Sequence, residues 1–196
     1  VITGAVTTQD YSRINCGGVT FNANSTAFNA QLNTSEEYTV ASTKTITCIN
    51  APRMNAMTFS GAGAIIFSGT TAPITTEDLS NINVDGSVTI NTTNCTNFRP
   101  TLTTAEAYVV TGVTLTVPDD HAAKLNAMTI SGNGNITINA LDDDADIDLS
   151  SITCSGTLTA IATATMEFTG NLGTFNVTVN DSVVFTSTFA KLTNRT

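Results

Sequence analysis

Short runs of alternating hydrophobic and polar residues fill this chain, and the clearest example lies in residues 124–158. There, Leu125 and Leu149 each begin the same pattern. An apolar residue follows three positions later, another two positions after that, and then a Ser-Gly pair leads into a second alternating run. Alternation with a period of two is typical of a strand that buries one face. The pattern therefore predicts a strand, a glycine corner and a second strand, repeated along the chain.

The same pattern recurs around three aspartates, Asp10, Asp78 and Asp148. Their segments read TTQDYSRIN, TTEDLSNIN and ADIDLSSIT, and their positions differ by 78 − 10 = 68 and 148 − 78 = 70. A long repeat of about 70 residues follows, so residues 1–196 hold just under three copies and are expected to form a single domain. The isoleucines four positions after these aspartates are expected to point into the core: Ile14, Ile82 and Ile152.

Leucines at positions 125, 149, 172 and 192 divide the long repeat into coils of similar length. Their spacing gives a period of about 23 residues, which is typical of a solenoid. A leucine-rich-repeat horseshoe has a similar period, but it needs a helical segment in each turn, and only residues 122–125 suit one. We therefore predict an all-β fold, a parallel β-helix (β-solenoid), whose coils stack about 4.8 Å apart.

Composition strengthens the β prediction. Thr accounts for 39 of the 196 residues, and only 12% of residues are charged, against about 25% in typical domains. Thr, Val and Ile are β-branched and suit a pleated surface. The net charge of −9 argues against a nucleic-acid partner, since only seven Lys and Arg residues are present to neutralise phosphates.

No apolar run approaches the roughly 20 residues that a membrane-spanning helix needs, so we expect no membrane span. The first residue, Val1, is consistent with a processed secreted protein or with a piece of a larger chain.

Units such as LNAMTISGNGNITI and DLSSITCSGTLT make the chain resemble the Thr- and Gly-rich β-solenoid repeats of large bacterial cell-surface and adhesin-like proteins. The resemblance covers nearly the whole chain. It implies an extracellular or cell-surface location and a structural or adhesive role, and it implies no substrate.

An acidic stretch follows residue 141, with five carboxylates in seven residues. Carboxylate oxygens are the ligands that Ca²⁺ prefers. The candidate ligands are Asp142, Asp144, Asp146 and Asp148. The equivalent loop at residues 69–78 is far less acidic, and no glycine follows to make the sharp turn of an EF-hand loop. A solvated acidic corner is therefore the favoured alternative to a Ca²⁺ site, and no other cofactor is expected.

No constellation of catalytic residues stands out, so we expect no enzymatic activity. Asp10, Asp78 and Asp148 recur at one corner of the coil, where a short carboxylate accepts backbone N–H groups. The lone His121 follows Asp119 and Asp120 and has no Ser or Cys motif to act with, so a surface loop is expected.

The cysteines follow the repeat in part. Cys16 and Cys154 align with Val84, and Cys48 aligns with Val117, so all three are expected to be buried free thiols. A disulfide between Cys16 and Cys154 is excluded because six coils would separate them by about 29 Å. Cys95 lies outside the pattern and receives no assignment.

Eight N-x-S/T sequons would permit glycosylation, although so many Asn and Thr residues also create sequons by chance. They begin at Asn24, Asn33, Asn91, Asn94, Asn135, Asn176, Asn180 and Asn194. Outward Thr-x-Thr pairs, at 114/116 and 157/159, raise ice binding as a further alternative. These pairs are not expected to recur in one register in every coil.

Architecture thus favours an extracellular structural protein, a subunit of a fibre, sheath or surface layer. The last residues stop at a point in the repeat that the first residues of another copy would continue, which predicts that copies stack head to tail. The alternatives are an adhesin segment that binds surface glycans and, less favoured, a polysaccharide-degrading β-helix enzyme.

Overall fold

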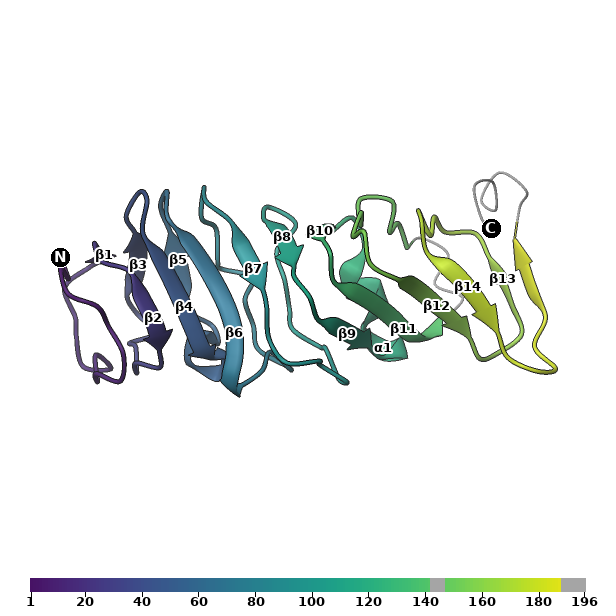
Figure 1. Ribbon diagram of the computed structural model, residues 1–196, viewed down its shortest axis with the longest axis horizontal. Helices are drawn as coiled ribbons and strands as arrows, with labels where there is room; N and C mark the ends of the chain where they lie inside the picture. Colours follow the sequence, from purple (N-terminus) through teal and green to yellow (C-terminus); the bar gives the residue numbers. More distant parts are fainter. Residues whose placement is uncertain (142–146, 188–196) are drawn as a thin grey trace.

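A computed structural model describes residues 1–141 and 147–187, which form a rod of stacked parallel strands (Figure 1). The strands of the first half are β1 (Val19–Phe21), β2 (Ser25–Phe28), β3 (Glu37–Val40), β4 (Thr45–Asn50), β5 (Thr58–Ser60), β6 (Ala64–Ala72) and β7 (Val88–Ile90). Those of the second half are β8 (Ala107–Val110), β9 (Thr114–Val117), β10 (Thr129–Gly132), β11 (Asn135–Leu141), β12 (Leu158–Ala162), β13 (Met166–Phe168), β14 (Asn176–Val179) and β15 (Phe185–Ser187). The helical segments are η1 (Ala51–Met54), α1 (Asp119–Ala122) and η2 (Ala123–Leu125).

The parallel β-helix prediction is confirmed. Every named strand pair in the described residues is parallel. Equivalent strands lie about 21 residues apart over about 8 turns, so the coil is slightly shorter than the leucine spacing predicts. Residues 122–125, the one candidate for a helical segment, lie within α1 and η2, whereas η1 was not anticipated.

One six-stranded sheet, in the order β10-β8-β7-β6-β4-β2, runs through both halves of the rod. A three-stranded sheet, β1-β3-β5, flanks it in the first half, and a four-stranded sheet, β14-β12-β11-β9, flanks it in the second. The last pair is β13-β15. Strand β7 joins the halves, because Val88 lies between Ile65 of β6 and Tyr108 of β8. The coil therefore shifts sideways by one strand at β7, which a strict long repeat does not predict.

The core forms because alternate residues of each strand point inward. Strand β12, for example, buries Leu158, Ala160 and Ala162 and exposes the residues between them in part. In the first half, Tyr38 stacks between Phe21 and Phe59 with ring centroids 5.7 and 5.4 Å away.

The three isoleucines behave unequally. Ile82 and Ile152 are buried as expected. Ile14 is only half-buried against the core, because it lies in the first coil, which has a neighbouring coil on one side only in the described structure.

Candidate functional site

The recurrent aspartates hold coil corners, as predicted from their spacing. The Oδ1 atoms of Asp10, Asp78 and Asp148 accept hydrogen bonds from the backbone N–H two residues later, at 2.9, 3.0 and 2.9 Å. Ser80 also donates its hydroxyl to Asp78 at 2.6 Å. Hydrogen bonds from the following serine lower the pKa of both Asp10 and Asp78 from their ordinary value. These carboxylates are engaged in structural hydrogen bonds at the coil corners.

Asparagines connect one coil to the next at the same corner. The Oδ1 atoms of Asn55 and Asn126 accept the backbone N–H groups of Asp78 and Asp148, at 2.8 and 2.7 Å. Three sequon asparagines make similar bonds across coils: Asn24 to Thr45 N, Asn94 to Thr114 N and Asn135 to Thr157 N, at 2.9, 2.9 and 2.7 Å. These contacts account for the three asparagines structurally, and glycosylation of the sequons stays a prediction.

Two buried glutamates, which the sequence reasoning missed, hold the glycine turns. Glu36 accepts the backbone N–H groups of Cys16 and Gly18 at 3.0 and 2.9 Å, and Glu106 accepts that of Val84 at 2.8 Å. Burial raises the pKa of Glu106. Their spacing, 106 − 36 = 70, is the signal that could have found them.

Of the predicted Ca²⁺ ligands, Asp142, Asp144 and Asp146 lie outside the described residues, so the site stays a prediction. Asp148 holds the corner already described. In the part of the chain that the structure describes, no group of three His, Cys, Asp or Glu side chains is arranged to hold a metal ion.

His121 does not lie in a surface loop, contrary to expectation. Its side chain is buried, and its Nε2 donates to the carbonyl oxygen of Pro100 at 2.8 Å. Helix α1 places it there, since the helical turn directs the ring against the preceding coil. Next to it, Arg99 and Asp120 form an ion pair between the same two coils.

All four cysteines are free thiols. Cys48 and Cys154 are buried as predicted, and Cys95 is buried with its Sγ 3.0 Å from the carbonyl oxygen of Ile74. Cys16 is exposed, contrary to expectation, because it lies at a turn of the first coil, where its Sγ is 3.7 Å from Glu36 Oε2.

The outward face of the four-stranded sheet carries an uncharged polar array. One row aligns Thr116 with Thr137, Thr137 with Thr159, and Thr159 with Asn176. A parallel row places Thr114 beside Asn135, whose Nδ2 donates to Thr114 Oγ1 at 3.2 Å. The Thr-x-Thr pairs at 114/116 and 157/159 fall in the same register but do not recur in every coil, as expected, because Asn135 stands in the coil between them and Asn176 in the coil after them. The six-stranded sheet mixes Ile66 and Val109 with its threonines.

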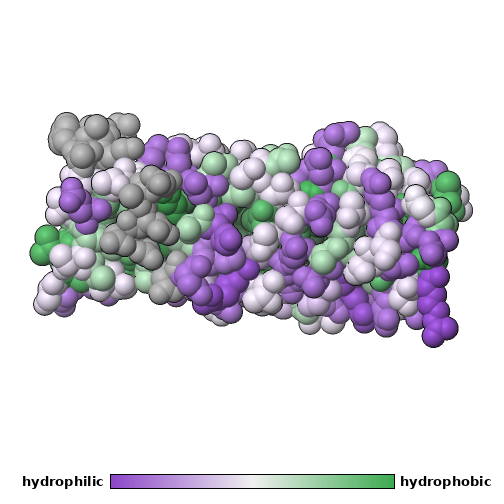
Figure 2. Space-filling view, turned by 180° about the vertical axis from the view of Figure 1, so that it is seen from behind, coloured by the Kyte–Doolittle hydropathy of each residue, from purple (hydrophilic) through white to green (hydrophobic). Residues whose placement is uncertain are grey.

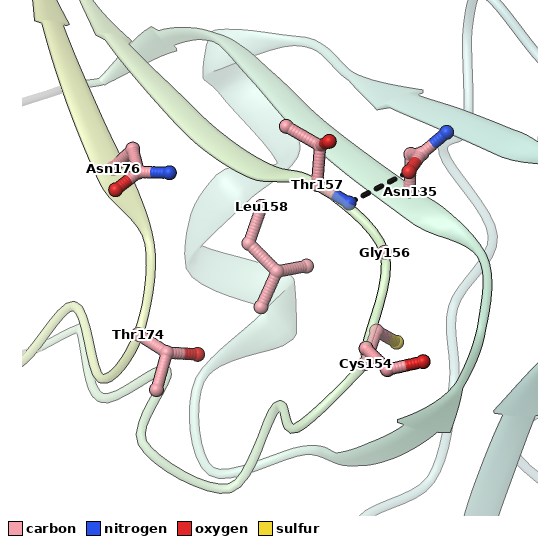
Figure 3. A pocket seen from close by; sticks show the side chains of 8 residues that line it. Asn135, Cys154, Gly156, Thr157, Leu158, Thr174 and Asn176 are labelled. Atoms are coloured by element: carbon pink, nitrogen blue, oxygen red, sulfur yellow. Dashed lines mark hydrogen bonds between the residues drawn. The ribbon is translucent and has the colours of Figure 1, made fainter.

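A groove of about 370 Å³ opens at one edge of this array (Figure 3). It is lined by residues 154–158 and by Asn135, Thr174 and Asn176. Figure 3 shows Thr174 and Asn176 on one side, facing Thr157 and Cys154 across the hollow, with Leu158 between them. None of the lining residues carries a formal charge.

No protein-family model, curated protein or solved structure matches this chain.

A second hollow, also of about 370 Å³, is lined by Pro52, Asn55, Thr75, Thr76 and Glu77. Its one carboxylate is already engaged, since Glu77 Oε2 accepts the backbone N–H of Thr75 at 2.6 Å. The groove beside Asn176 is therefore the better candidate for binding. No helix in the described residues is long and apolar enough to cross a membrane.

Proposed function

We propose that this chain is a structural protein of the cell surface or extracellular space, a β-solenoid rod that joins further copies of itself end to end. One observation carries the proposal. The large hydrophobic side chains that are exposed in the described residues lie at the two ends of the rod: Val1 at 86%, and Val179 and Val184 at 43% and 59%. In Figure 2, hydrophobic atoms likewise reach the surface at both ends, while the face between them is mostly polar or neutral.

Backbone geometry at the end that carries Val179 and Val184 supports the same assembly. β14 pairs only with β12, and β15 only with β13, so within the described residues one edge of each strand has no partner strand. Unpaired edges of parallel strands are templates for pairing with another chain. A contact between two different ends does not close on itself, and it therefore extends into a filament.

An adhesive role is the second candidate, because the groove beside Asn176 is neutral and polar. Such a lining suits a glycan better than an ionic partner. The two roles are compatible, since a rod can carry a binding site on its side.

The assembly is tested by sedimentation velocity and negative-stain electron microscopy over a range of protein concentrations. The wild type is expected to form particles that lengthen with concentration. The double variant V179K/V184K is expected to stay monomeric, because two ammonium groups would be desolvated in the contact. Thr129→Lys is the matched control, since Thr129 is exposed on β10 in the middle of the rod, and it is expected to assemble normally.

A wild type that remains monomeric at the highest concentration overturns the proposal. So does a double variant that assembles as well as the control.

A further inference from the structure

The groove beside Asn176 exists because one coil takes a shorter path than the coil before it. Asp148 pairs with Asn171, and Thr159 pairs with Asn176. Between these two pairings the earlier coil runs from position 148 to position 159, whereas the later coil runs only from position 171 to position 176. The later coil therefore omits the segment that would stack on Ile152 and on the turn that follows it.

Because the later coil omits this segment, no glycine turn of that coil covers the turn at Gly156. Gly156 lies directly on Gly134, so closely that a Cβ on Gly156 would overlap the carbonyl oxygen of Gly134. In the next coil the chain passes through Thr174 instead, at the side of the turn, and the space above Gly156 becomes the groove.

A hydrogen bond to the preceding coil holds the wall formed by the earlier coil. Asn135 Oδ1 accepts the backbone N–H of Thr157 at 2.7 Å, which fixes the turn against the preceding strand. Leu158, only 3% exposed, begins strand β12 beside the turn and packs into the core.

The opposite wall offers free polar groups. Asn176 is exposed, and its side-chain amide makes no hydrogen bond to another described residue. Figure 3 shows the amide directed toward the hollow, as is the hydroxyl of Thr174. An amide presents a donor and an acceptor side by side, which matches two neighbouring hydroxyl groups of a ligand.

We propose that this groove binds one residue of a neutral, hydroxyl-rich saccharide. Its volume lies within the range of about 300–1,000 Å³ that is usual for small-molecule sites. The amide of Asn176 and the hydroxyl of Thr174 pair with sugar hydroxyls. The groove adjoins the end of the rod that carries Val179, because Asn176 and Val179 both lie on β14, so saccharide binding is measured at a protein concentration at which the wild type is monomeric.

Charge excludes an acidic ligand. An acidic saccharide would find no cation in the lining, and the chain has a net charge of −9.

The test titrates ¹⁵N-labelled protein with cellohexaose, mannohexaose and N-acetylchitohexaose, and with an oligogalacturonate as the acidic comparison. At least one neutral hexasaccharide is expected to shift the side-chain amide signals of Asn176 and Asn135 at millimolar concentration. Asn176→Ala and Thr174→Val are each expected to weaken binding about tenfold, which corresponds to the loss of a hydrogen bond to the ligand. Asn180→Ala, exposed in the same coil but outside the groove, is the control and is expected to bind normally.

Circular dichroism checks that each variant keeps its β content. The proposal is overturned if no neutral hexasaccharide moves these amide signals, if only the oligogalacturonate does, or if both groove variants bind as tightly as Asn180→Ala.

Discussion

At the scale of single residues, acidic side chains in this protein act mainly as acceptors for backbone N–H groups at coil corners. Asp78 caps such a corner through Ser80, and its pKa is lowered by those hydrogen bonds. Replacing it with alanine is expected to cost about 1 kcal/mol of unfolding free energy, the usual effect of losing a capping side chain. Asp85→Ala, at an exposed position in the next turn, is the control, and urea unfolding measures both.

The lowered pKa of Asp78 also predicts a pH dependence. A carboxyl group whose pKa is depressed by folding stabilises the fold above its unfolded pKa, and that contribution is lost as pH falls through the folded pKa. The difference in melting temperature between the wild type and Asp78→Ala should therefore shrink toward about pH 2, well below the ordinary Asp pKa. A difference that stays constant with pH would show that the carboxylate charge plays no part.

The pH dependence of stability expected from Glu106 runs in the opposite direction to that from Asp78. Burial raises its pKa, so its contribution to stability is present at low pH and declines as pH rises through the folded pKa. Glu106→Gln keeps an oxygen to accept Val84 N–H but removes the charge. Thermal melts should therefore show the variant above the wild type at about pH 8 and close to it at about pH 4, below the ordinary Glu pKa. A variant that is much less stable at both pH values would contradict this reasoning.

At the scale of elements, glycine turns allow neighbouring coils to stack closely, because glycine has no Cβ. Gly86 rests on Gly63, and a Cβ at Gly86 would overlap the carbonyl oxygen of Gly63. Gly86→Ala is expected to cost about 2–3 kcal/mol, because the backbone at Gly63 and Ala64 must move away from the added Cβ. Gly4→Ala, where a Cβ would meet nothing nearby, is the control. Equal unfolding midpoints for the two variants would refute the close stacking.

Strand positions and the Asp corners could be predicted because both follow from local pattern: alternation sets the inward face, and Asp followed by Ser two residues later sets the turn. The burial of positions that depend on neighbouring coils could not be predicted. Cys16 aligns with buried residues, yet it is exposed because its first coil has few neighbours. His121 looked like a loop residue, and only the carbonyl of Pro100, 21 positions earlier in the chain, explains its burial.

The groove beside Asn176 was also beyond prediction. It arises from residues that the later coil lacks, and a missing segment leaves no motif in the sequence. The sideways shift of the coil at β7 could not be predicted either. The aligned tyrosines Tyr38 and Tyr108 are both buried but belong to different sheets.

At the scale of the whole molecule, the six-stranded sheet should make the two halves unfold together. Solenoids are stabilised mainly by contacts between neighbouring coils, so a local defect normally spreads only as far as those contacts carry it. Ile90 of β7 is buried and paired with Phe67 in the first half and with Val110 in the second. A packing defect at Ile90 therefore perturbs both halves at once.

Ile90→Asp is therefore expected to lower hydrogen-exchange protection in both the three-stranded and the four-stranded sheets, because an unpaired buried carboxylate costs several kcal/mol. Val40→Asp is the matched comparison. Val40 is also buried, but it ends β3, which among the described strands pairs only with β1 and β5. Its effect should be concentrated in the first half, with protection of β11 and β12 largely kept. If Ile90→Asp leaves either half protected, the halves fold independently, and the shared sheet joins them without coupling their stability.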